Sequence, residues 1–372
     1  MRDASRARLL NRAECLSPAR VWIDSLLASW GTGEVDIRDT VFVSTPGTQL
    51  RLEADAMRVV HPDRPGRHLV PLHRVESLVL WRGVDATPDV LTWCSIHGVQ
   101  VSWITQNGKL LASITGHESA RPHLRLAQVR SFDDPDRRVT IARWLVAAKL
   151  QNYRQLLLRA AHDANRERQR VLRGIAEIHG EALGSLKATQ NLTEILGVEG
   201  RAARSYFRNL NALIEDAPQG RTRRPPTDAV NCYLSAAYGL LRSSVHSAIA
   251  HVGLDASIGF LHGVRGGKPA LALDLMEEMR ALMADRMVAT LFNRGEVRAE
   301  YWREAEGGSV FLTDAGWKHL LNAWVVARQR EWPHVGLGRK VRAAEIPFWQ
   351  ARALARHLRE PEHQYVPWQV AR

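Results

Sequence analysis

Apolar and polar residues alternate with a strand-like period from about residue 40 to residue 114. Pro46-Gly47 is typical of a turn, and Gln106-Asn107-Gly108 is typical of a tight hairpin between two strands. A short helix is expected over 88–97, because Gly98 can cap its C-terminus. Residues 37–118 are therefore predicted to form a small β domain. Its expected strands are 41–45, 49–53, 57–61, 68–72, 77–81, 99–104 and 109–114.

Beyond Gly116 the spacing of apolar residues becomes helical, so residues 119–372 are predicted to form a larger, all-α C-terminal domain. The fold class is therefore α+β, with a small N-terminal β-sheet domain followed by the helical domain. Residues 1–36 are an N-terminal extension without an assigned role, in which one helix is expected over 21–27. The expected helices of the C-terminal domain are 138–161, 166–180, 199–214, 226–252, 269–293, 313–329 and 347–359.

Composition places the chain among globular proteins with an excess of positive charge. Of 372 residues, 45% are hydrophobic, which excludes a disordered polycation. Lys and Arg number 51 against 39 Asp and Glu, a net charge of +12, which favours a polyanionic partner. On charge alone, a ribosome-associated or merely basic protein fits equally well. The three cysteines are widely spaced and no secretory signal is recognisable, which favours the reducing cytoplasm. No apolar run reaches the roughly 20 residues that span a bilayer, which argues against a membrane partner.

Three acidic residues follow Pro269 at the start of a predicted helix. Asp274, Glu277 and Glu278 stand at positions i, i+3 and i+4, so they are expected to share one face. Like charges placed in this way repel by a few tenths of a kcal/mol per pair, and a bound cation would remove that penalty. A solvated acidic face that suits the helix dipole is the alternative interpretation.

Glu199 and His262 are two further candidate ligands. Glu199 lies between two glycines at a predicted helix start, where its alternative role is a charge that stabilises the helix dipole. His262 follows the apolar run 258–261 and could be an ordinary core or surface histidine, but the loop 263–268 is long enough to return it to Asp274. Two carboxylates and one imidazole suit Mg²⁺ or Mn²⁺ better than a closed zinc site. A metal among arginines favours phosphodiester chemistry.

Basic side chains near these blocks could bind DNA phosphates, although solvated stripes and inert basic loops are common alternatives. Some form a stripe on the helix that begins near Glu199. Others lie in the proline- and arginine-rich segment 217–226, which is predicted to be an exposed loop. The candidate DNA-binding residues are Arg201, Arg204, Arg208, Arg221, Arg223, Arg224, Arg242, Arg265 and Lys268.

Together these blocks resemble the CRISPR adaptation integrase, the first of the numbered CRISPR-associated protein families. The resemblance runs from about Thr40 to His357 and is closest to the type I-C branch. Residues 1–36 precede the usual start of the family, and Met279 stands where phenylalanine is common. The motifs that carry the resemblance are 43–47, 149–152, 199–207, 223–231, 259–262, 271–278 and 312–314.

The resemblance implies a metal site and a set of partners. The metal ligands correspond to Glu199, His262 and Glu277, with Mg²⁺ or Mn²⁺ as the cofactor. Asp274 corresponds to an acidic neighbour and Tyr238 to a tyrosine near the active site, so both are also candidate catalytic residues. The family forms homodimers through its β domains, and a small companion subunit of the second numbered family bridges two dimers into a heterohexamer.

The implied activity is the insertion of captured foreign DNA into a CRISPR array. The 3′-hydroxyl of the fragment would attack a phosphodiester at a repeat boundary, so the substrates are double-stranded DNA fragments and the repeat. Two alternatives remain open. One is a metal-dependent repair nuclease that acts on branched DNA with water as the nucleophile, and the other is a catalytically decayed DNA-binding scaffold.

Overall fold

The structure is a computed structural model. It describes residues 39–43, 45–62, 64–104, 110–114, 122–215, 217–218, 220–222, 225–264 and 266–370. The helix expected over 21–27 and the candidate residues Arg223, Arg224 and Arg265 lie outside these ranges. No helix in the described ranges is long and apolar enough to cross a membrane.

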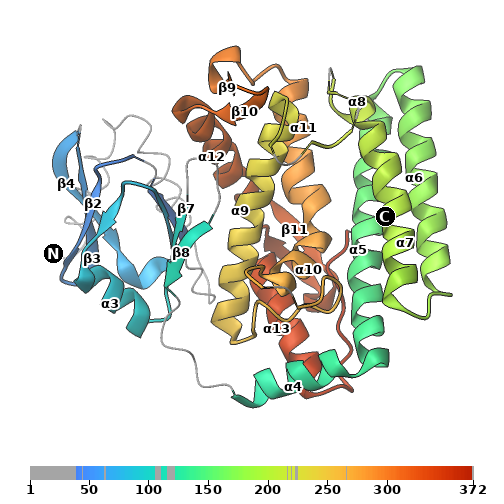
Figure 1. Ribbon diagram of the computed structural model, residues 1–372, viewed down its shortest axis with the longest axis horizontal. Coiled ribbons are helices and arrows are strands. Elements are labelled where there is room, and N and C mark those ends of the chain that lie inside the picture. The colour runs from blue at the N-terminus through green and yellow to red at the C-terminus, as the bar shows by residue number, and fades with distance from the viewer. Residues whose placement is uncertain are drawn as a thin grey trace.

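The N-terminal part folds into two four-stranded sheets, which confirms the predicted β region (Figure 1). In the first sheet, β5 lies between its parallel neighbours β1 and β7, and β8 pairs antiparallel with β7 as the hairpin motif predicts. The turn of that hairpin, 105–109, lies outside the described residues. The second sheet has the order β4-β3-β2-β6, and the short helix α3 follows it. The elements are β1 (Asp39–Val43), β2 (Gln49–Glu53), β3 (Ala56–His61), β4 (Arg64–Pro71), β5 (Val75–Trp81), β6 (Asp85–Ala86), α3 (Pro88–Ile96), β7 (Gln100–Ile104) and β8 (Leu110–Ile114).

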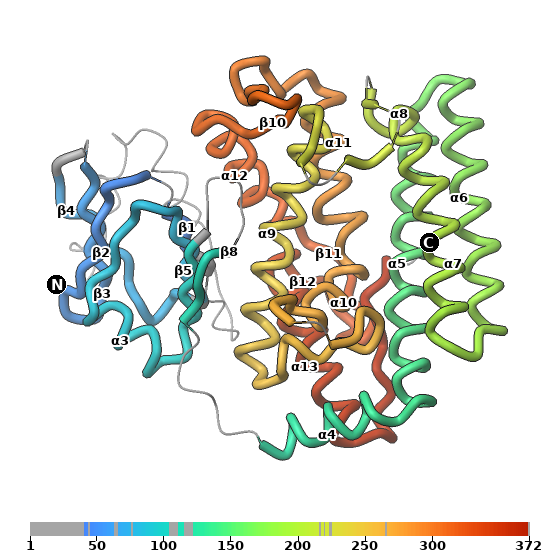
Figure 2. The backbone as a smooth tube through the Cα atoms, in the orientation of Figure 1, coloured from blue at the N-terminus to red at the C-terminus, as the bar shows by residue number. Residues whose placement is uncertain are grey.

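The rest of the chain is mostly helical, and its longest helix is α5 (Pro135–Asp163). Proline occupies the first turn of α5, and the Asp134 side chain accepts hydrogen bonds from two backbone N–H groups there. Figure 2 shows α5 between α7 on one side and α10 on the other, and both helices pack against it. The other helices are α4 (Pro122–Asp133), α6 (Arg166–Leu186), α7 (Leu192–Arg208), α8 (Leu210–Leu213), α9 (Ala229–Val252), α10 (Ala270–Met279), α11 (Arg286–Asn293), α12 (Asp314–Gln329) and α13 (Ile346–Arg359).

The structure departs from the sequence prediction in several elements of the C-terminal part. Two short hairpins interrupt the helical part, and α4 was not expected. The helix predicted over 269–293 contains a π-helical turn, Arg280–Asp285, between α10 and α11. The hairpins pair β9 (Trp302–Ala305) with β10 (Ser309–Leu312) and β11 (Glu331–His334) with β12 (Arg339–Arg342).

Helix α7 begins at Leu192, earlier than the predicted start at residue 199. The side chain of Asn191 accepts a hydrogen bond from the Glu194 backbone, and the Glu194 side chain accepts one from the Gln190 N–H. This reciprocal cap offsets the low helix propensity of the glycines that follow. Glu199 is consequently an interior helical residue and not a charge at the helix N-terminus.

One hydrophobic core joins the two parts of the chain. Trp81 at the end of β5 and Trp317 on α12 are both buried, and their rings meet edge to face with centroids 5.4 Å apart. The core then continues along α9 and α10 towards α5. The helices that carry the candidate ligands are therefore held by packing on several sides.

Candidate metal centre

Lys149 of α5 lies between two of the three predicted metal ligands. Its Nζ is 2.5 Å from Glu199 Oε1 on α7 and 2.7 Å from Glu277 Oε2 on α10. The Lys149 side chain is only 8% exposed. Three helices thus bring two carboxylates, remote in sequence, to the two sides of one buried ammonium group.

Glu277 is strongly held in its ionised form. Its Oε1 accepts a hydrogen bond of 2.6 Å from Arg280 Nη2, and its side chain is 3% exposed. Burial alone would raise the pKa of Glu277, but the positive charges of Arg280 and Lys149 outweigh burial and lower the pKa to about 2. Nearby His262 lowers the pKa of Glu277 further. A buried carboxylate that is ionised at neutral pH can act as a metal ligand.

His262 is oriented by Asp274, as the loop length predicts. Asp274 Oδ1 lies 2.6 Å from His262 Nδ1 and also accepts the His262 backbone N–H at 3.0 Å. Burial lowers the pKa of His262, but the hydrogen bond and charge of Asp274 outweigh it, so the pKa is raised overall. With Nδ1 bonded to a carboxylate, Nε2 is the ring nitrogen left to bind a metal ion.

Gly259 permits the close approach of the histidine loop to α10. A Cβ atom at this position would lie 2.7 Å from the carbonyl carbon of Ala270 and 2.8 Å from Asp274 Oδ2. Any side chain here would therefore push the loop away from α10. The glycine in the 259–262 motif is thus explained by packing.

The structure does not gather the three ligand atoms into one compact cluster. Among the residues it describes, three such atoms lie within 4.8 Å of one another only at Glu360, Glu362 and His363. At the candidate centre, the Lys149 ammonium lies between Glu199 and Glu277. The donor set nevertheless fits a divalent ion. Lys149 Nζ lies 2.7 Å from the buried Glu277 Oε2, but this oxygen accepts no hydrogen bond of good geometry, so it can still bind a cation.

The acidic face of α10 is buried, so the solvated alternative is wrong. Asp274 and Glu278 are 0% exposed, and each has partners different from those of Glu277. Glu278 accepts hydrogen bonds from Gln350 Nε2 and the Trp368 N–H, each at 2.7 Å, and from the Tyr365 hydroxyl. Glu278 therefore fastens the C-terminal segment to α10, next to the candidate ligand Glu277.

We expect Glu278→Gln to change how folding stability depends on pH. Burial raises the pKa of Glu278 from 4.5 to about 7, although its three hydrogen bonds oppose the rise. Between these values the folded state binds a proton that the unfolded chain releases, so the carboxyl stabilises the fold below pH 4.5 and this contribution is lost as pH rises through 7. From pH 5.5 to 7.5 the loss is about 2 kcal/mol. Urea unfolding of both proteins at the two pH values should show a smaller decrease in Glu278→Gln, and equal decreases would contradict the expectation.

The π-helical turn after α10 positions groups that support Glu277. Arg280 begins this turn, and its guanidinium carbon lies 4.8 Å from the ring centroid of Tyr238. Asp285 ends the turn and accepts hydrogen bonds from Tyr238 at 2.5 Å and from Tyr206 at 3.0 Å. Tyr238 therefore contacts Arg280, which in turn donates a hydrogen bond to Glu277. Sequence reasoning missed Lys149, Arg280 and Asp285, although Lys149 belongs to the 149–152 motif.

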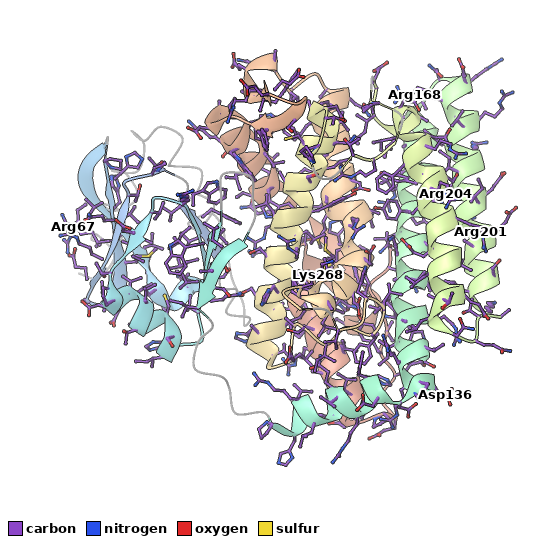
Figure 3. All side chains as sticks on the ribbon, in the orientation of Figure 1. Arg67, Asp136, Arg168, Arg201, Arg204 and Lys268 are labelled. Atoms are coloured by element: carbon purple, nitrogen blue, oxygen red, sulfur yellow. The ribbon has the colours of Figure 1, made fainter. Side chains whose placement is uncertain are left out.

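Six of the nine candidate DNA-binding residues lie in the described ranges. Arg201, Arg204 and Arg208 lie on α7, and Lys268 is exposed in the loop before α10. Figure 3 labels Arg201, Arg204 and Lys268. Their role as DNA contacts remains a prediction. Arg242 on α9 is partly buried and lowers the pKa of His246, whose burial is the larger cause.

Arg221 does not lie on an exposed loop as predicted. Its Nη1 donates to Asn231 Oδ1 at 2.8 Å, and its Nη2 donates to Ser235 Oγ at 2.9 Å. The guanidinium carbon also lies 5.5 Å from the Tyr238 ring centroid. These contacts fasten the segment to α9, so Arg221 has a structural role in the described arrangement.

The chain matches the family model described as CRISPR associated protein Cas1 over residues 41–325. The CRISPR-associated endonuclease Cas1 1 of Moorella thermoacetica is 36% identical over 336 residues, which cover 89% of this chain and 98% of the relative. The CRISPR-associated endonuclease Cas1 2 of Rhodospirillum rubrum is 36% identical over 349 residues, with the same coverage. The chain therefore spans nearly the whole length of both relatives.

Solved structures confirm the fold at lower sequence identity. A casposase bound to its integration product has a TM-score of 0.75 at 23% identity, covering 90% of this chain and 95% of the other. A Cas1 protein from Thermotoga maritima has a TM-score of 0.73 at 22% identity, covering 86% and 96%. A Cas6-RT-Cas1–Cas2 complex has a TM-score of 0.78 at 20% identity, covering 92% of this chain and 37% of that one.

Proposed function

The chain belongs to the Cas1 family of CRISPR-associated endonucleases, and from this premise we propose that it is a metal-dependent integrase of captured DNA. The observation that carries the proposal is the buried Lys149 ammonium held between Glu199 and Glu277. Two carboxylates that both pair with one positive charge could also bind a metal cation. His262, oriented by Asp274, supplies the third donor.

Each residue of the candidate centre has a different role in strand joining. A bound Mg²⁺ or Mn²⁺ ion would polarise a phosphoryl oxygen as a Lewis acid. Glu199, Glu277 and His262 would hold the ion, and Asp274 would keep His262 Nε2 directed towards it. Arg280 keeps Glu277 ionised and in place.

The chemistry is a transesterification. The 3′-hydroxyl oxygen of the fragment forms a bond to phosphorus at the repeat boundary, while the bond from phosphorus to the leaving oxygen of the repeat strand breaks. The proton of the attacking hydroxyl passes to the leaving oxygen. One phosphodiester replaces another, so no nucleotide has to be hydrolysed.

The proposal extends to partners and subtype. Arg201 and Arg204 on α7, together with the exposed Lys268, would contact backbone phosphates, a sequence-independent grip that suits fragments of variable sequence. We propose a homodimer through the β domain, a heterohexamer with a Cas2 companion, the type I-C branch and action in a prokaryotic cytoplasm. One of the solved neighbours is a Cas6-RT-Cas1–Cas2 complex, which supports the choice of companion.

Strand joining should depend on the 3′-hydroxyl and on the divalent ion. We expect a labelled duplex fragment with 3′-hydroxyl ends to join a plasmid that carries a CRISPR repeat in Mn²⁺. The same fragment with 3′-dideoxy ends, or a reaction in EDTA, should give no joined product. The measurement is the fraction of label that migrates with the plasmid on a denaturing gel.

The same assay separates the alternatives. Cleavage of branched DNA without joining, insensitive to the 3′ end, would favour the repair nuclease. DNA binding without either reaction in Mn²⁺ would favour the decayed scaffold. Both outcomes would contradict the integrase proposal.

A further inference from the structure

Three guanidinium groups converge on the buried indole ring of Trp332 on β11. Arg159 lies near the end of α5, Arg286 begins α11 and Arg330 follows α12. Their guanidinium carbons lie 5.8, 5.3 and 5.8 Å from the Trp332 ring centroid. Within the described ranges, none of the three guanidinium groups forms an ion pair with a carboxylate. The cation–π contacts are favourable, but three like charges around one ring repel one another.

The electrostatics of Arg286 show this repulsion. Burial lowers the pKa of Arg286, and the charges of Arg330 and Arg159 lower it further, to about 10. Arg280 is also buried, yet Glu277 and other neighbours raise its pKa. The contrast identifies the Trp332 cluster as a group of arginines that no carboxylate of the described residues compensates.

A pocket of about 450 Å³ adjoins the cluster, between α5, α6, α8 and α11. This volume lies in the range of small-ligand sites. Arg159 and Arg286 line the pocket, together with Arg168 (Figure 3) and Arg294. Two acidic residues also line the pocket: Glu215 lies 3.8 Å from Arg168, and Asp163 lies 2.9 Å from the imidazole of His162. The remaining wall is largely apolar.

We propose that Arg159, Arg286 and Arg330 form a phosphate-binding site beside this pocket, separate from the candidate metal centre. Arg159 and Lys149 are ten residues apart on α5, which corresponds to about 15 Å along a helix. Guanidinium forks match the geometry of phosphate oxygens, and a phosphate would supply the negative charge that the cluster lacks. The phosphate belongs either to a DNA strand, in which case the site rests on the proposed function, or to a free nucleotide or pyrophosphate.

The test compares two double variants of the full chain. Arg159→Gln/Arg286→Gln removes two members of the cluster. Arg339→Gln/Arg352→Gln is the matched control, because these two arginines flank Trp349 at 5.8 and 5.7 Å but share their surroundings with Glu345, which accepts the Trp349 indole N–H. Both variants lose two positive charges and two cation–π contacts.

Pyrophosphate binding, measured by calorimetry without metal or DNA, is the first readout. We expect the affinity to fall at least about tenfold in Arg159→Gln/Arg286→Gln, the loss of about one charge-assisted hydrogen bond, and less than about twofold in the control. Thermal unfolding without phosphate should show the cluster variant to be at least as stable as the unmodified protein, because the repulsion is relieved. Equal pyrophosphate affinities of the unmodified protein and the cluster variant would overturn the proposal.

Oligonucleotide binding at several salt concentrations identifies the source of the phosphate. If a DNA strand occupies the site, the slope of log affinity against log salt should fall by about one to two units in the cluster variant, and less in the control. An unchanged slope with lost pyrophosphate binding assigns the site to a free phosphate compound. Failure of strand joining alone leaves the inference intact, because pyrophosphate binding is measured without that reaction.

Discussion

Replacing Glu199 or His262 with alanine is expected to reduce strand joining about 1,000-fold or more while leaving DNA affinity nearly unchanged. Each change removes one donor to the cation whose charge stabilises the attacked phosphate, a contribution of several kcal/mol. About 4 kcal/mol corresponds to a factor of roughly 1,000 in rate. DNA affinity should persist, because the arginines of α7 and Lys268 remain. The measurements are the joining rate in Mn²⁺ and fluorescence anisotropy of a labelled duplex.

Two matched variants serve as controls for this prediction. Glu181→Ala removes an exposed glutamate from α6, and His162→Ala removes an exposed histidine from the end of α5. Both should join strands at the unmodified rate. If Glu199→Ala and His262→Ala also join strands at that rate, the ligand assignment is wrong and the metal must be held elsewhere.

The sequence predicts the architecture well, because apolar periodicity reports which faces are buried. The change from a strand-like to a helical period marks the boundary between the β region and the helices. Short amphipathic hairpins carry too few residues for a clear period, so β9–β10 and β11–β12 were missed. The start of α7 was predicted too late, because the low helix propensity of Gly197 and Gly200 obscured the N-cap at Asn191.

The sequence predicted the candidate metal ligands but not the basic residues that neutralise their charge. Residue spacing correctly predicted the contact between His262 and Asp274, because the short loop 263–268 limits the distance between the two residues. Spacing alone also placed Glu277 and Glu278 on one face, whereas burial gives each a separate set of partners. Lys149 was missed because a lysine on a long helix is ordinarily exposed, and only the packing of α7 and α10 against α5 buries it.

Burial of Lys149 makes the candidate centre nearly neutral without a metal. The ammonium compensates Glu199 and Glu277, much as a cation would, while Arg280 holds the second oxygen of Glu277. A divalent ion that binds the two carboxylates must therefore displace or shift the Lys149 ammonium. Lys149 is thus expected both to stabilise the metal-free fold and to compete with the metal.

Lys149→Met should separate these two effects. Without metal, the substitution leaves two carboxylates facing each other without their shared cation, and removing one partner of a buried pair typically costs about 3–5 kcal/mol. In Mn²⁺ the variant should recover more stability than the unmodified protein, because the ion replaces the missing charge without a competitor. The measurements are urea unfolding followed by far-UV circular dichroism, with and without Mn²⁺, and Mn²⁺ affinity by calorimetry.

Two further variants decide whether charge at this position is the cause. Lys340→Met removes an exposed lysine from β12 and should change neither stability nor Mn²⁺ affinity. Lys149→Arg keeps the positive charge, so it should remain more stable than Lys149→Met without metal and should bind Mn²⁺ less tightly than Lys149→Met. If Lys149→Met unfolds at the same urea concentration as the unmodified protein and binds Mn²⁺ with the same affinity, the Lys149 ammonium does not compete with the metal ion for its binding site. The geometry between Glu199 and Glu277 would then have to be explained by packing alone.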